Sequence, residues 1–287
     1  FLRAIGFSDI TKKDLEMILD EVITRPEIMK ITKDSEGNEF AELSGSFAAN
    51  AGITVRGTYQ EDDSFHMDYY YPYVFGTSIT TNEQIDVEKH AEKESYAGVC
   101  DEVNLGVTLI FYIQNVADYL AETNRHLSKI HYGAMLAGLS TEGKILCPVV
   151  ERKKNDVPAI QKNDRHNQLI AQAREGDEDA IESLTLEDMD TYALLSQRVM
   201  KEDIFSIVKS TFMPFGIESD QYTVLGEIID CVTMENKLTH EKLYGMKLLC
   251  NNIQFDVCIN EKDLLGEPAI GRRFRGNVWM QGNLCLE

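Results

Sequence analysis

The feature that most constrains this chain is a hydrophobic period of two, which occupies two long stretches of it. Apolar and polar residues alternate over about residues 27–75. The same alternation returns after Ser219, through about Tyr222–Met234, Tyr244–Cys250, Ile253–Ile259 and Phe274–Gln281. A period of two places alternate side chains on opposite faces of a strand, which is typical of antiparallel sheets with one buried face. The sequence therefore predicts two β-rich portions.

A helical, strongly charged segment separates these portions, and one helix precedes them. Thr11 and Asp14 form a capping box at the start of the leading helix, and Pro26 ends it after about Thr24. We therefore expect an α+β fold, mostly antiparallel β. Its predicted parts are a β-rich N-terminal portion with one leading helix at 1–150, a helical connecting segment at 151–211 and a β-rich C-terminal portion at 212–287.

The first portion carries three further predictions. Residues 76–103 have many acids and no clean period, so they are predicted to be a solvated connection, with at most a short helix. The run Val107–Ile113 is apolar on both faces and predicts a central strand, followed by a helix over about Asn115–Asn124. The stretches Lys129–Leu139 and Lys144–Val150, joined by the turn-like residues 140–143, predict a hairpin.

The last portion has the layout of a small OB-like barrel. A glycine lies inside its first strand at Gly226, a hairpin follows, and a loop with Gly266 and Pro268 precedes the final strand. This similarity rests on glycine placement, and a generic antiparallel sheet is the alternative.

Charge limits the classes of partner. The chain has 48 acidic against 28 basic residues, a net charge of −20. Nucleic-acid affinity comes largely from Lys and Arg that neutralise phosphates, so we expect no nucleic-acid partner and no anionic membrane surface. The chain shows no secretory signal and no apolar run long enough to cross a bilayer, so a cytoplasmic location is expected.

Six cysteines are spread along the chain, and no pair is closer than eight positions. Zinc sites and redox motifs require C-x-x-C or a similar spacing, so we expect no metal and no cofactor. A sizeable core makes disulfides unnecessary. All six are therefore predicted to be buried thiols: Cys100, Cys147, Cys231, Cys250, Cys258 and Cys285.

No catalytic motif is present. Phosphate-binding loops require glycines spaced as G-x-G-x-x-G or a G-K-[ST] ending, and neither occurs. Ser46 and Ser140 lack the flanking glycines of a nucleophile elbow. Whether the protein is an enzyme therefore stays open.

Two segments are candidate binding sites. The aromatic run DYYYPYVFG at 68–76 is predicted to pack on a core, the alternative being an exposed stacking platform. The locally basic C-terminal segment holds Arg272, Arg273, Arg275 and the only tryptophan, Trp279.

Strand parity gives this basic segment two faces. It places Arg273, Arg275 and Trp279 on one face and Phe274, Val278 and Met280 on the buried face, provided that no bulge at Gly276 shifts the register. The arginines could then bind a carboxylate or phosphate, or simply pair with the surrounding acids.

Four stretches together resemble a known family: FLRAIGFSDI at Phe1, EGDEDAIESLTLEDMDTYALLSQRV at Glu175, FMPFGIESDQYTVLGEI at Phe212 and DLLGEPAIGRRFRGNVWMQG at Asp263. They are similar to a family of uncharacterised bacterial proteins of about this length, catalogued as a domain of unknown function. The resemblance implies a bacterial cytoplasmic protein and assigns no residue a role.

These observations favour a non-catalytic binding or interaction module for a protein or a small anionic ligand. The first alternative is an enzyme whose site is assembled from scattered residues. The second is an OB-like nucleic-acid binder, which the net charge disfavours.

Overall fold

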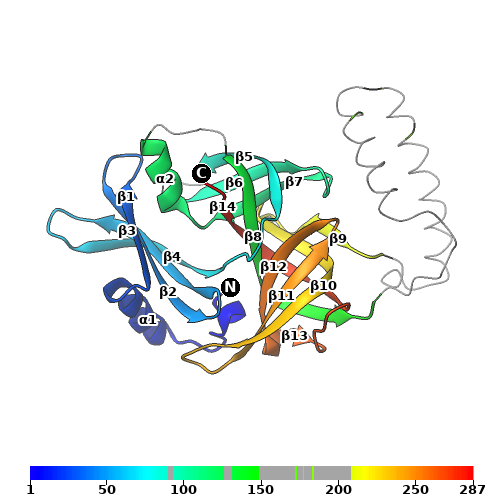
Figure 1. The fold of residues 1–287 in the computed structure, drawn as a ribbon. Helices are drawn as coiled ribbons and strands as arrows, with labels where there is room; N and C mark the ends of the chain where they lie inside the picture. The colour runs from blue at the N-terminus through cyan, green and yellow to red at the C-terminus, as the bar shows by residue number, and fades with distance from the viewer. Residues whose placement is uncertain are drawn as a thin grey trace.

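The structure is a computed structural model that describes residues 1–89, 93–125, 131–148 and 208–286, together with residues 172, 177 and 183. The fold is α+β and mostly antiparallel β (Figure 1). The described helices are α1 (Lys12–Thr24) and α2 (Val116–Asn124), with 3-10 turns η1 (Leu2–Ile5) and η2 (Glu261–Asp263). The strands are β1 (Ile28–Lys33), β2 (Glu39–Ala48), β3 (Ala51–Tyr59), β4 (Phe65–Val74), β5 (Thr81–Lys89), β6 (Tyr96–Glu102), β7 (Val107–Ile113), β8 (His131–Leu146), β9 (Thr211–Pro214), β10 (Gln221–Glu235), β11 (Lys242–Cys250), β12 (Ile253–Asn260), β13 (Leu264–Leu265) and β14 (Arg273–Leu284).

The N-terminal part confirms the sequence prediction. The Thr11 side chain caps α1 by accepting from the backbone N–H of Asp14, and the helix ends just before Pro26. β1 to β4 follow as an antiparallel sheet in chain order. α1 covers this sheet with Ile18, Leu19 and Val22, which are buried.

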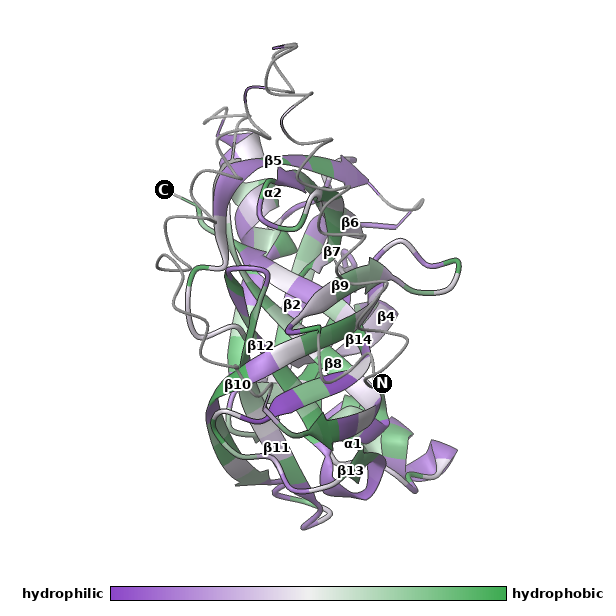
Figure 2. Ribbon diagram, turned by 90° about the vertical axis from the view of Figure 1, so that its right-hand side faces the viewer, coloured by the Kyte–Doolittle hydropathy of each residue, from purple (hydrophilic) through white to green (hydrophobic). Residues whose placement is uncertain are grey.

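The remaining strands form one large sheet, in which five strands close into a ring. β10 pairs with β11, β11 with β12, β12 with β8, β8 with β14, and β14 again with β10. In Figure 1 this ring lies beside the β1–β4 sheet, and Figure 2 shows hydrophobic segments along β8 and β12. A ring of five strands is one feature of an OB-fold, and the OB-like assignment itself stays a prediction.

β8 connects the strands of the N-terminal portion to those of the C-terminal portion within this sheet. It pairs with β5 on the N-terminal side and with β12 and β14 on the C-terminal side. Both β-rich portions therefore contribute to one sheet. The predicted helical segment at 151–211 lies outside the described residues, apart from isolated positions and its last few residues.

Two predictions for the first portion are wrong. Residues 76–103 contain strands β5 and β6, whose buried residues include Ile85, Tyr96 and Cys100. The acidic residues of this stretch are mostly at exposed positions of the strands. Their number obscures the alternation of apolar residues in the sequence. The predicted hairpin at 129–150 is instead the single long strand β8.

β8 continues through the turn-like residues because it takes one of them up as a bulge. Glu142 pairs with Asn277 and Ser140 with Val278 of β14, so Thr141 is the extra residue of a bulge on β8, and the Ser140 hydroxyl donates to the carbonyl oxygens of Glu142 and Asn277 there. β10, β11, β12, β14 and the helix at 115–124 are where the sequence predicts them, and β7 is central, whereas the sequence does not predict the short strands β9 and β13.

No helix among the described residues is long and apolar enough to span a membrane.

The cysteines are free thiols in the structure, but their burial differs. Cys100, Cys250 and Cys258 are buried, as predicted. Cys147 is exposed and Cys231 and Cys285 are half-buried, so the prediction that all six are buried is wrong. Burial raises the pKa of Cys100, Cys250 and Cys258 to about 12.

We expect the thiols to react with a disulfide reagent in two groups. At pH 8 the native protein should expose Cys147 to rapid reaction, whereas Cys100, Cys250 and Cys258 should react only after unfolding, because the thiolate is the reactive form. Because these three pKa values exceed 9.0 in the folded state, the stability they contribute is present below pH 9 and is lost as the pH rises toward 12. Equal reaction rates for all six thiols in native protein would contradict the placement.

Candidate functional site

The candidate site is a pocket on the outer surface of the strand ring. Its volume is about 440 Å³, within the range of small-molecule sites. Adjacent strands β13, β8, β14 and β10 form its floor, and the residue after β9 forms one wall. Its lining residues are Glu142, Gly143, Lys144, Phe215, Thr223, Leu265, Arg275, Gly276 and Asn277.

Two cations lie side by side in this pocket. Arg275 of β14 is the direct cross-strand partner of Lys144 of β8. Directly opposite residues with the same orientation have Cβ atoms only about 5 Å apart, so their like charges repel each other. In a chain of net charge −20, this pair places two cations next to each other in one pocket.

The next row of cross-strand partners consists of Glu142 on β8, Asn277 on β14 and Thr223 on β10. Asn277, at the centre of this row, is polar and uncharged. The Thr223 hydroxyl donates to Asn277 Oδ1 at 2.7 Å, and Asn277 Nδ2 donates to the Glu142 carboxylate. These two bonds fix the orientation of the Asn277 amide next to Arg275. Glu142 is the one carboxylate among the described lining residues, so the cations outnumber it by two to one.

Apolar side chains stand on both sides of the polar centre. Phe215 is 42% exposed, and its backbone N–H donates to the carbonyl of Gln221, which holds it beside β10. Leu265 is 75% exposed and pairs with Lys144 through the short strand β13. The pocket thus combines cationic and apolar surfaces.

The floor of the pocket consists of backbone without side chains at a cross-strand pair of glycines, Gly143 and Gly276. A Cβ atom at Gly143 would lie 2.4 Å from the Phe274 ring, which is fully buried inside the ring of strands. Glycine is therefore required here for Phe274 to pack directly beneath the pocket.

The structure gives the four predicted site residues different surroundings. Arg275 lines the pocket. Arg273 is 5% exposed, and its guanidinium donates to the carbonyl oxygens of Cys147 and Val208 at 2.9 and 2.6 Å. Burial lowers the pKa of Arg273. Arg272 is exposed and donates to the Glu267 carbonyl.

Trp279 lies farther along the same face of β14. Its indole N–H donates to Asp220 at 2.7 Å, and its ring lies 5.1 Å from Phe1 and 5.4 Å from Tyr112 between centroids. Phe274, Val278 and Met280 are in the core, as the strand parity predicts. The four residues therefore do not form one patch, and Arg275 is the one of them that lines the pocket.

Sequence reasoning did not find Lys144, Asn277 or Phe215. Lys144 and Arg275 are far apart in the sequence, and only the pairing of β8 with β14 brings them together. The prediction of a hairpin at 129–150 also concealed this pairing.

A second polar cluster is fully buried between the two sheets. Arg56 of β3 has no exposed side-chain surface, and its Nη1 donates to the hydroxyls of Tyr69 and Tyr112 at 3.0 and 2.8 Å. Its Nη2 donates to the Tyr71 hydroxyl and to the carbonyl of Gln114, at 3.1 and 2.7 Å. The prediction that the aromatic run packs on a core is confirmed, since Tyr71 and Tyr73 are buried.

Glu42 supplies the counter-charge of this cluster. Its Oε2 lies 3.2 Å from Arg56 Nη2 and accepts from the backbone N–H of Ala117 at the start of α2. Burial raises the pKa of Glu42 despite these partners. The cluster ties β2 and β3 to β7 and α2 through bonds among its own charges, hydroxyls and backbone groups, so we assign it a structural role.

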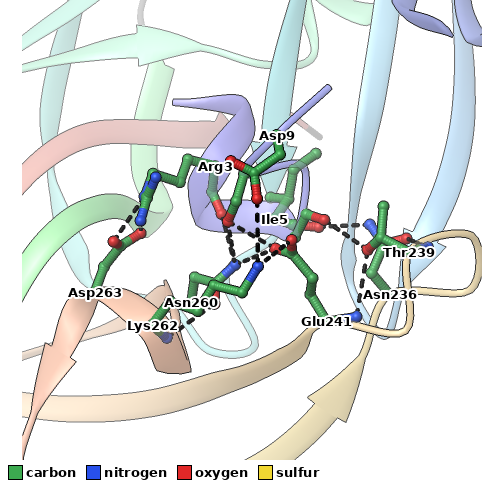
Figure 3. A network of polar contacts seen from close by, with 11 residues as sticks. Arg3, Ile5, Asp9, Asn236, Thr239, Glu241, Asn260, Lys262 and Asp263 are labelled. Atoms are coloured by element: carbon green, nitrogen blue, oxygen red, sulfur yellow. Dashed lines mark hydrogen bonds and ion pairs between the residues drawn. The ribbon is translucent and has the colours of Figure 1, made fainter. Parts of the chain in front are cut away.

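A third network holds the N-terminal segment on the outer face of the ring, over β12 (Figure 3). Buried Asn236 donates to the carbonyl of Ile5 at 2.7 Å, and buried Asn260 donates to the carbonyl of Arg3 at 3.2 Å. Arg3 in turn pairs with Asp263 at 2.6 Å. This segment therefore covers part of β12.

Within the described residues, no group of three or more His, Cys, Asp and Glu side chains could hold a metal ion. No histidine or cysteine is among the described residues that line the pocket. The groups available there are two cations, a carboxylate, an amide, a hydroxyl and apolar surface.

A protein-family model matches the chain over residues 2–282. Its description is "Domain of unknown function, E. rectale Gene description (DUF3881)". No curated protein and no solved structure matches the chain.

Proposed function

Because the chain belongs to the DUF3881 family, whose description assigns no activity, its function is argued from the pocket, and we propose a non-catalytic module that binds a small anion there. The single observation that carries the proposal is the cross-strand pairing of Lys144 with Arg275 in a concave surface. A bidentate guanidinium beside an ammonium suits a phosphate or carboxylate.

The charge of the rest of the molecule makes this site selective. A net charge of −20 repels polyanions at long range, whereas a small anion that reaches the pocket meets two cations at short range. We therefore propose a small-molecule ligand rather than nucleic acid. A bacterial cytoplasm, where small phosphates and carboxylates are abundant, is the proposed setting.

Thermal unfolding of the full chain with inorganic phosphate tests the proposal. A ligand that binds only the folded state at one hundred times its Kd stabilises it by about 2.7 kcal/mol, which raises the unfolding midpoint by several degrees. We expect this rise in the wild type and its loss in Arg275→Met.

Two controls accompany this measurement. Lys12→Met removes a 92% exposed cation on α1 and should keep the full rise. Potassium chloride at equal ionic strength should produce no comparable rise. The proposal fails if phosphate stabilises Arg275→Met as much as the wild type, or stabilises neither protein beyond the salt control.

A further inference from the structure

The apolar sides of the pocket indicate which kind of chemical group is attached to the bound anion. This inference rests on the proposed function. Phe215 and Leu265 are both exposed, and they stand on opposite sides of the strands that hold the two cations. A hydrated inorganic anion gains nothing from either side chain. A ligand with an apolar body would bury part of both.

The position of Phe215 suggests the shape of that body. Phe215 follows β9 and lies beside Gln221 of β10, two residues before Thr223, whereas Leu265 lies beside Lys144. The cationic row and the aromatic ring are thus at different ends of the lining, with the Thr223–Asn277 hydrogen bond between them. An aromatic side chain favours a flat partner that can stack or meet it edge-on.

We infer that the ligand is an organic anion in which a phosphate or carboxylate is attached to a flat apolar group. Its anionic end binds Lys144 and Arg275, and its apolar end contacts Phe215. The volume of about 440 Å³ accommodates a group of one or two rings.

Calorimetric titration of the full chain with three probes tests this inference: phenyl phosphate, inorganic phosphate and benzyl alcohol. We expect phenyl phosphate to bind about tenfold more tightly than inorganic phosphate, because ring contact adds to the charge interaction. Benzyl alcohol, which has the ring without the charge, should show no measurable binding.

Two matched variants locate the apolar contribution. Phe215→Ala should reduce the preference for phenyl phosphate over inorganic phosphate to less than about threefold. Met213→Ala is the control, because Met213 is 53% exposed on the adjacent strand and is not among the lining residues. It should retain the tenfold preference.

The outcomes separate the two proposals. Equal affinities of the wild type for the two phosphates, or an undiminished preference in Phe215→Ala, would overturn the inference and leave the anion site standing. No binding of either phosphate would overturn the proposed function itself.

Discussion

Replacement of Arg56 by methionine should destabilise the protein by about 3–5 kcal/mol, a large share of the stability of a typical domain. Methionine fills a similar volume but leaves Glu42 without its counter-charge, and it removes the donors that Tyr69, Tyr71 and Tyr112 accept from. Unpartnered polar groups in a buried position keep their full desolvation cost. Chemical unfolding followed by circular dichroism measures the change.

Two further variants show whether the charge is responsible. Arg275→Met makes the same substitution at the half-buried pocket position and should change the free energy of unfolding by less than about 1 kcal/mol. The double variant Arg56→Met with Glu42→Leu should recover part of the loss, because it removes both buried charges. An Arg56→Met protein as stable as the wild type would show that the cluster does not hold the sheets together.

Gly52→Ala should also be strongly destabilising, by about 3 kcal/mol, at the upper end of overpacking effects. The added Cβ would lie 2.1 Å from the Gly45 carbonyl oxygen and 2.7 Å from the Tyr73 hydroxyl. The first of these neighbours is backbone of β2, which cannot move without breaking the pairing of β2 with β3. The same unfolding measurement detects this effect.

Gly245→Ala is the matched control in the middle of β11. Its added Cβ would meet the ends of the Val232 and Met234 side chains at 3.0 and 3.1 Å, and these can rotate away. We expect a change of about 1 kcal/mol or less. Similar losses of unfolding free energy for both glycine variants would mean that the close approach of the β2 backbone is not what requires glycine at position 52.

The sequence predicts individual elements well where the alternation is clean. On β14 it places Phe274, Val278 and Met280 in the core and Arg275 on the opposite face, as the structure has them. Arg273 shares the parity of Arg275 but is buried, because two backbone carbonyls from distant segments accept from its guanidinium. Parity gives the face of a strand and does not show what covers that face.

The other wrong or missing predictions also result from contacts between distant parts of the chain. Ser140 and Gly143 are typical turn residues, and they stay in a strand because Ser140 donates to carbonyl oxygens at the bulge of β8 and Gly143 makes room for Phe274. The buried ion pair of Glu42 with Arg56 has no local signal, since each residue lies within an ordinary alternating strand. Contacts between residues that are far apart in the sequence decide both features. A single sequence does not show which distant residues come together.

The charge dependence of phosphate binding tests the central claim most directly. Equilibrium dialysis with labelled inorganic phosphate compares the wild type, the double variant Lys144→Met with Arg275→Met, and Glu142→Gln. We expect the double variant to bind at least about tenfold more weakly, because charge-assisted hydrogen bonds are lost. Glu142→Gln should bind about threefold more tightly, since it removes a repelling charge and keeps an oxygen to accept from Asn277. Equal affinities across the three proteins would contradict the assignment of an anion site to this pocket.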